Sequence, residues 1–394
     1  MNNENKTLYE EESISSKHNI NIPNLNINKK VSIVSYDEAP DFQKDNEYIK
    51  GGYLINCNTP IRLTKSLFML HNETINIWTH LLGVILVIIF IVYIAIYITF
   101  YKTQIMNIKL DFEKIKKFAK PLQDLDNKLK ELKIKFDKKF NITDFSNFMD
   151  KFNTSVYLLK NSTKETSFSK YYERLLELLS DLKQDYNKKN LHRWPIFIML
   201  ISAILCLSFS TQYHILGVIS KKINSFSSRF DYGGISLLIA GSCYPPYYYF
   251  FHCDNIFKSI YLCFITIFAL CVFFYSLTSD FYLPTRRTFR GILFLILGLS
   301  TAIPVFHLIF LNKTITGFME GPRLIYWYFG GISYVFGALL YINRIPEKCF
   351  PGKFDIFGSS HQLFHCLVLL GVIFHYLGCL DAYYYRFDAS CPFK

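Results

Sequence analysis

The chain has 394 residues, of which 51% are hydrophobic and 18% aromatic, and its formal net charge is +12. The apolar residues are concentrated in nearly uncharged stretches of about 20 residues, the length that crosses a hydrocarbon layer. This pattern excludes an ordinary soluble domain and indicates an integral, polytopic membrane protein. The positive charge does not indicate a nucleic-acid-binding protein, because +8 of it lies in one insertion, residues 101–193. A basic surface beside anionic lipid accounts for that charge.

The chain begins with two segments that precede the first apolar stretch. Residues 1–35 are polar and Asn-rich, which predicts a disordered cytosolic N-terminus. Residues 36–70 are expected to be a cytosolic pre-membrane segment, and apolar side chains such as Ile49, Tyr53, Phe68 and Leu70 predict that it packs on the inner end of the bundle. No cleavable signal peptide is visible, so we expect the first spanning helix to act as the targeting signal.

Seven apolar segments predict an all-α membrane protein, a seven-transmembrane helix bundle. The predicted spans are residues 75–99, 196–217, 233–251, 256–277, 291–311, 324–342 and 361–380. They define a membrane domain of residues 71–100 and 194–381, which is interrupted by the insertion 101–193 and followed by a tail, residues 382–394.

Lysine and arginine residues in the short loops predict the orientation, because cytosolic loops carry the excess of positive charge. One side carries nine: Lys221, Lys222, Arg229, Arg286, Arg287, Arg290, Arg344, Lys348 and Lys353. The other side carries three: Lys258, Lys313 and Arg323. The N-terminus is therefore predicted to be cytosolic and the C-terminal tail extracellular.

Potential glycosylation sites agree with this orientation. Four Asn-X-Ser/Thr sequons fall in predicted outer loops and begin at Asn141, Asn153, Asn161 and Asn312. We expect a glycoprotein of the plasma membrane, although any secretory-pathway membrane fits. Cys253 and Cys391 are both predicted to lie outside, and whether they pair stays open.

The insertion 101–193 contains two heptad-like patterns, which predict two helices. The first comprises Ile115, Phe118, Leu122, Leu125, Leu129, Leu132 and Phe136, and the second comprises Phe168, Tyr172, Leu175, Leu179, Leu182 and Tyr186. We expect an antiparallel extracellular helical hairpin between the first two spans. It is either a spacer or a stalk that binds an extracellular ligand.

Histidines inside the predicted spans suggest a metal site, because ionisable groups in a membrane are costly. His361 and His365 lie four residues apart on one face of the last span, near its cytosolic end. The second span ends at the same level with His214. Three imidazoles are a typical ligand set for zinc, so we predict a Zn²⁺ site formed by His214, His361 and His365.

Two further polar residues are predicted at this depth. Asp231 begins the third span, and Ser210 lies one turn before His214. In a catalytic site, Asp231 could take a proton from metal-bound water or hold that water by a hydrogen bond, and Ser210 could donate to an oxyanion or orient the water. The alternative is a zinc ion that only clamps three helices together. His71 and His80 could contribute from the start of the first span.

Several motifs resemble one known family. The segments His71-Asn-Glu-Thr-Ile-Asn-Ile-Trp-Thr-His80, Ser210-x-x-x-His214, Phe230-Asp231-Tyr-Gly-Gly and Ser360-His-Gln-Leu-Phe-His365 are similar to those of the progestin and adipoQ receptor family, which is related to haemolysin III, and in particular to its adiponectin receptor branch. The resemblance covers about residues 37–100 and 195–380. The long insertion departs from that family, whose first outer loop is usually short.

This resemblance implies the same zinc ligands, with Asp231 and Ser210 nearby and the N-terminus inside. It also implies a function: adiponectin receptors are associated with ceramide hydrolysis, and other relatives are described as steroid receptors or as regulators of lipid and zinc homeostasis. We therefore expect a zinc-dependent lipid amide hydrolase of ceramidase type that is linked to signalling. The alternatives are a signalling receptor with a purely structural zinc and, on the haemolysin resemblance, a pore or transporter.

Overall fold

The computed structural model describes residues 30–118, 191–311 and 324–388. Its α-helices are α1 (Pro60–Ser66), α2 (Thr74–Phe118), α6 (Trp194–Leu216), α7 (Lys221–Phe250), α8 (Asn255–Ser276), α9 (Arg287–Ser300), α10 (Ile303–Leu311), α12 (Ile325–Asn343) and α13 (Ser360–Asp388). Two short strands, β1 (Ser32–Val34) and β2 (Tyr53–Ile55), and two 3₁₀ turns, η1 (Asp41–Gln43) and η2 (Pro284–Arg286), complete it.

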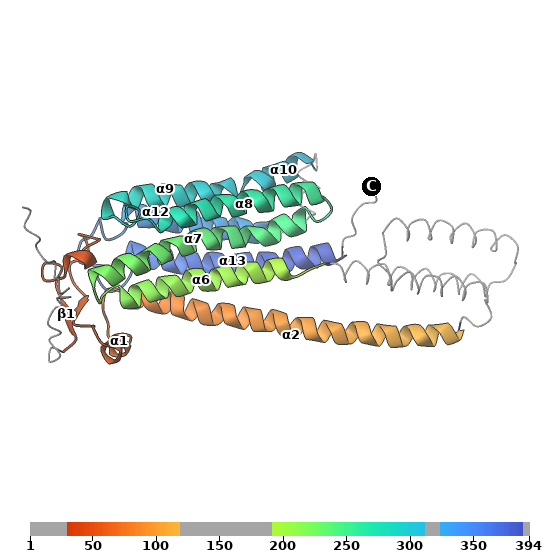
Figure 1. Cartoon of the computed structure of the whole chain (residues 1–394), viewed down its shortest axis with the longest axis horizontal. Helices are drawn as coiled ribbons and strands as arrows, with labels where there is room; N and C mark the ends of the chain where they lie inside the picture. The colour runs from red at the N-terminus through yellow and green to blue at the C-terminus, as the bar shows by residue number, and fades with distance from the viewer. Residues whose placement is uncertain (1–29, 119–190, 312–323, 389–394) are drawn as a thin grey trace, which may run out of the picture.

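The long helices run side by side as one bundle (Figure 1). β1 and α1 lie at one end of it, and α13 finishes near the other end. α2 continues well beyond the bundle in the direction away from β1. We call the end beside β1 and α1 the N-terminal end of the bundle.

Six helical stretches of the described residues are long and apolar enough to cross a membrane. They are Thr74–Ile96, Trp194–Leu216, Asn255–Ser276, Pro284–Leu308, Ile325–Asn343 and Ser360–Arg386. Each of them overlaps one of the predicted spans, and α9 and α10 together supply the fifth. The third predicted span, residues 233–251, lies in α7, which is not one of the six. The count of seven spans therefore stays a prediction.

The position of α7 explains its composition. It packs between α6 and α8 and also contacts α13, so that little of its surface can meet lipid. Many of its buried residues are small, among them Gly233, Gly234, Ser236 and Gly241. Small residues let neighbouring helices approach closely, which is how helices associate within membranes. A helix enclosed in this way does not need an apolar surface.

The bundle has an apolar exterior. Large exposed aliphatic and aromatic side chains occur along α2 and α8, for example Leu82, Ile85, Ile89, Ile256, Ile260 and Phe264. The interior core lies among α2, α6, α7 and α13 and includes Val87, Met199, Leu207 and Val372. Apolar residues on both sides of a helix indicate a bundle surrounded by lipid.

The pre-membrane segment folds over the N-terminal end of the bundle. β1 and β2 pair in antiparallel register, Val34 opposite Tyr53. Ile49 and Tyr53 are buried, whereas Phe68 and Leu70 are 78% and 61% exposed. Phe68 and Leu70 therefore do not pack on the bundle as expected, and the two strands, of three residues each, are not indicated by the sequence patterns. β1 lies within the stretch expected to be disordered, residues 1–35, of which residues 1–29 are outside the described ranges.

Most of the predicted extracellular hairpin, with three of its sequons, also falls outside the described residues. Residues 101–118 do not start a separate element but continue α2. Asn312 and Cys391 are likewise outside the described ranges. Cys253 is disulfide-bonded, and whether Cys391 is its partner stays open.

The close packing of α6 on α7 leads to a prediction. A Cβ atom at Gly241 would lie 1.9 Å from Ser202 Oγ and 2.5 Å from Ser202 Cβ. We expect Gly241→Ala to destabilise the protein by about 1–3 kcal/mol, because the helices must separate to admit the methyl group. Thermal unfolding in detergent measures this change. Gly331→Ala is the control, because a Cβ there meets nothing within 4 Å, and equal stability of the two variants would contradict the packing.

Candidate metal centre

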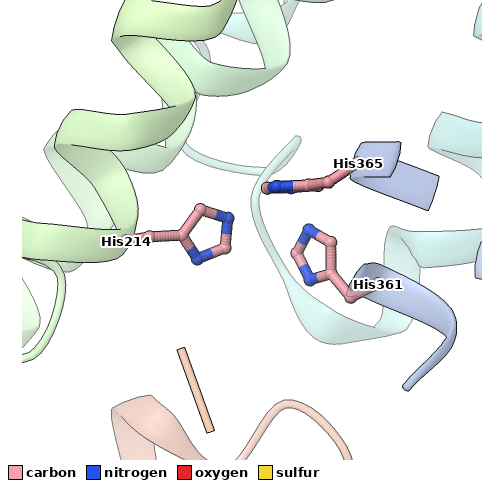
Figure 2. A group of neighbouring side chains, drawn as sticks. All are labelled: His214, His361 and His365. Atoms are coloured by element: carbon pink, nitrogen blue, oxygen red, sulfur yellow. The ribbon is translucent and has the colours of Figure 1, made fainter. Parts of the chain in front are cut away.

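Two helices bring three histidines together at the N-terminal end of the bundle. His214 lies in the last turn of α6, which ends at Leu216. His361 and His365 lie in the first two turns of α13, four residues apart and therefore on one face. Figure 2 shows the His214 ring directed toward the other two rings. The predicted convergence of these three residues is present in the structure.

The three imidazoles are close enough to share one ion. One nitrogen from each ring lies within 4.8 Å of those of the other two. The ring centroids are 5.0 Å apart for His214 and His361, 4.9 Å for His214 and His365, and 4.7 Å for His361 and His365. His214 and His365 are each only 2% exposed. This buried cluster could hold a metal ion.

The outer nitrogens of two rings have hydrogen-bond partners. His214 Nδ1 lies 2.7 Å from Glu73 Oε2, and the same oxygen accepts a bond from Asn76 Nδ2 at 2.6 Å. His365 Nδ1 lies 3.2 Å from the carbonyl oxygen of Asn76. Metal-binding histidines typically donate their second nitrogen to such acceptors, which fixes the tautomer and the ring orientation.

The inner nitrogen of His214 supports the same interpretation. His214 Nε2 is buried and has no hydrogen-bond partner among the described residues. A buried polar atom without a partner is costly, so it indicates a ligand that supplies the missing interaction. The residues present therefore fit a metal ion coordinated by imidazole nitrogens.

His80 of α2 adjoins the cluster, whereas His71 does not contact the three rings. The rings of His80 and His365 stack with centroids 3.7 Å apart and 2° between their planes. His71 instead lies 3.2 Å from the Ser66 carbonyl oxygen through Nε2, and its Nδ1 accepts from the Glu73 N–H. It therefore stabilises the chain entering α2.

The structure places Asp231 and Ser210 beside the cluster. Asp231 of α7 is 8% exposed and Ser210 of α6 is 2% exposed. The Asp231 carboxylate lies near the imidazole of His214 and the hydroxyl of Ser210. Ser210 Oγ itself has no hydrogen-bond partner among the described residues. Two buried oxygen-bearing side chains are thus available next to the imidazoles.

Glu73 and Asn76 were not among the residues predicted for the site. They lie in the motif His71–His80, of which the two histidines are the most typical metal ligands. A signal was present, because a carboxylate just before a membrane span needs a partner or water. Its partner His214 is distant in sequence, so the pairing could not be derived from spacing.

These features define a polytopic α-helical membrane protein with a buried cluster of three histidines at one end of its bundle. Residues 68–119 and 166–376 match the family described as Haemolysin-III related, and the chain belongs to this family. This confirms the family resemblance that the sequence motifs suggested.

Relatives extend along most of the chain. It is 34% identical to "Heptahelical transmembrane protein 5" of Arabidopsis thaliana over 377 residues, which cover 93% of this chain and 94% of that protein. It is 33% identical to "Heptahelical transmembrane protein ADIPOR3" of Oryza sativa subsp. japonica, covering 88% and 89%. The "Adiponectin receptor protein" of Drosophila melanogaster is 40% identical over 186 residues, 47% of this chain and 42% of that protein. The chain is thus similar to adiponectin receptors.

The contact between Glu73 and His214 leads to a prediction. We expect Glu73→Gln to weaken binding of a divalent transition-metal ion about 10- to 100-fold, because His214 loses the carboxylate that orients it. Competition with a chromophoric chelator measures the affinity of the purified protein. Glu38→Gln is the control, since Glu38 is exposed in the pre-membrane segment. Equal affinities of the two variants would exclude a role for Glu73 in orienting His214.

Proposed function

We propose that this protein is a zinc-dependent lipid amide hydrolase of the ceramidase type, linked to signalling. The observation that carries the proposal is the convergence of three imidazole nitrogens within 4.8 Å, and the burial of Asp231 and Ser210 in neighbouring helices supports it. Three histidine ligands with one open position are typical of catalytic zinc. Bound zinc would polarise a carbonyl and acidify a water molecule.

The side chains of the site have separate roles in this proposal. His214, His361 and His365 hold the ion, and Glu73 fixes the ring of His214. Asp231 accepts the proton of the attacking water and later delivers it to the leaving amine. The Ser210 hydroxyl donates a hydrogen bond to the developing oxyanion.

The membrane setting favours a lipid as the substrate. The exterior of the bundle is apolar, and the His cluster lies at the level where membrane-spanning helices begin or end. A ceramide dissolved in the bilayer could reach this level without entering water. We further propose α7 as the seventh span and a cytosolic N-terminus, in keeping with the heptahelical names of the relatives. The same proposal places the protein in the plasma membrane and includes an extracellular ligand that binds the insertion, residues 101–193.

The alternative is a signalling receptor in which zinc is purely structural. The burial of His214 and His365 favours it, because a substrate must reach the ion. A cavity lined in part by Tyr93, Arg193 and Tyr383 lies toward the opposite end of the bundle from the histidines. Its volume is about 10 Å³, which has room for about one water molecule but not for a lipid. The name of the Drosophila relative is also that of a receptor.

Release of fatty acid from a panel of ceramides distinguishes the two functions. We expect hydrolysis by the wild type and a decrease of about 100-fold or more in Asp231→Asn, because the amide cannot accept the proton. Asp280→Asn is the matched control, since Asp280 is exposed in the loop after α8. Negligible release from the wild type, with zinc bound, would favour the receptor.

Removal of the metal is a second test. We expect a chelator to abolish fatty-acid release and Zn²⁺ to restore it, whereas Mg²⁺ should not, because it prefers oxygen ligands. Metal content by mass spectrometry accompanies the assay. Full hydrolysis by metal-free protein would exclude the zinc mechanism, whatever the outcome for Asp231.

A further inference from the structure

A buried carboxylate that the proposed chemistry does not use lies at the start of α13. Glu347, from the loop between α12 and α13, is 0% exposed. Its Oε2 accepts a hydrogen bond from the Ser360 N–H at 2.7 Å, and its Oε1 accepts one from the Ser360 hydroxyl. Ser360 is the first residue of α13 and directly precedes His361. A carboxylate at a helix N-terminus satisfies free N–H groups and is favoured by the helix dipole, so Glu347 fixes the turn that carries His361.

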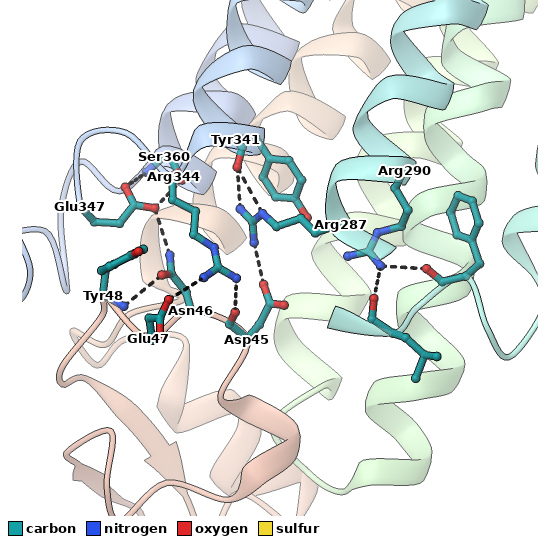
Figure 3. Close-up of polar contacts among 12 residues, drawn as sticks. Asp45, Asn46, Glu47, Tyr48, Arg287, Arg290, Tyr341, Arg344, Glu347 and Ser360 are labelled. Carbon is teal, nitrogen blue, oxygen red and sulfur yellow. Dashed lines mark hydrogen bonds and ion pairs between the residues drawn. The ribbon is translucent and has the colours of Figure 1, made fainter. Parts of the chain in front are cut away.

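The pre-membrane segment supplies the third bond to this carboxylate. Asn46 Nδ2 donates to Glu347 Oε1 at 3.0 Å. The Asn46 side chain is itself oriented, because its Oδ1 accepts from the Tyr48 N–H at 3.1 Å. Figure 3 shows Asn46 between Tyr48 and Glu347. A residue near the start of the chain thus contacts the group that holds the start of the last helix.

The neighbouring residue Asp45 connects to the same helix by a second route. Arg287 Nη1 lies 2.8 Å from Asp45 Oδ2, and its Nη2 donates to the Tyr341 carbonyl at 2.8 Å. The guanidinium also lies 3.9 Å from the centroid of the Tyr341 ring. That ring meets His361 edge to face at a centroid distance of 5.2 Å. Contacts from Asp45 to Arg287, from Arg287 to Tyr341 and from Tyr341 to His361 therefore connect the Asp45 carboxylate indirectly to the His361 ring.

A third contact fixes the backbone of this segment. Arg344 Nη2 donates to the Asp45 carbonyl at 2.6 Å, and Arg344 Nη1 lies 3.7 Å from Glu47 Oε1. Residues 45–48 are thus attached to α9, to the end of α12 and to the loop before α13 (Figure 3). The other two candidate ligands have different supports, Glu73 for His214 and Asn76 for His365. His361 is the ligand on which residues 45–48 act.

We propose that residues 45–48, with Glu347, position His361 and so set how tightly the centre holds its metal. The inference rests on the proposed metal centre but not on hydrolysis. Asn46 and Glu347 are positioning residues that do not touch the ion. Displacing residues 45–48 from the bundle would release the first turn of α13 and with it one of three ligands, which makes the pre-membrane segment a control point for the centre.

The test measures metal release from full-length purified protein. Zinc-loaded protein is mixed with a chromophoric chelator, and cobalt-loaded protein gives a visible spectrum that reports the coordination of the ion. Asn46→Ala removes one hydrogen bond to Glu347. Glu347→Gln replaces one accepting oxygen by an NH₂ group, which then faces a donor of Ser360 or Asn46. We expect zinc release about tenfold faster in Asn46→Ala and 10- to 100-fold faster in Glu347→Gln, the range for loss of groups that orient metal ligands. The cobalt spectrum should change in both.

The control is Asp41→Asn, because Asp41 lies in the same segment with its side chain fully exposed. It should match the wild type in release rate and spectrum. Wild-type rates and spectra in Asn46→Ala would overturn the inference and leave the metal centre intact, and this variant decides the test if Glu347→Gln does not fold. Wild-type protein that takes up neither zinc nor cobalt would overturn the metal centre and the inference together.

Discussion

The hydrogen bond between the Glu73 carboxylate and the His214 imidazole is the contact on which the N-terminal end of the bundle depends. Ionisable groups among membrane-spanning helices are costly unless they find partners. Glu73 joins the start of α2 to the end of α6, and Asn76 extends the contact to His365 of α13. Three helices are thereby held at one level by polar groups rather than by apolar packing alone.

The rest of the molecule separates polar from apolar surfaces accordingly. Lipid-facing positions on α2 and α8 carry aliphatic and aromatic side chains, whereas α7 carries glycine and serine where it meets its neighbours. Polar interactions gather at the N-terminal end, where the pre-membrane segment covers the bundle. Main-chain and side-chain atoms of that segment form hydrogen bonds and ion pairs with α9, the end of α12 and the loop before α13. The segment is therefore a structural part of the site.

Much of this arrangement could be predicted from the sequence, because membrane spans are long apolar segments and their alternating direction places residues at defined depths. That reasoning brought His214 to the level of His361 and His365 without knowledge of any contact. It could not identify Glu73 or Glu347, whose partners lie far away in the chain and follow no spacing rule. The predicted third span begins at residue 233, whereas the helix α7 begins at Lys221, because its first residues are polar and give no hydropathy signal. The strands β1 and β2 were missed because three residues are too few for a periodic pattern.

α2 is one continuous helix that begins at the N-terminal end of the bundle and extends beyond its other end (Figure 1). α2 carries Asn76 and His80 in its first turns and continues past the apolar stretch that ends at Ile96 as far as Phe118. At about 1.5 Å per residue the extra part is roughly 30 Å long. Consecutive backbone hydrogen bonds couple each turn of the helix to the next. The same helix therefore links residues 97–118 directly to the turn that carries His80, whose ring stacks on that of His365.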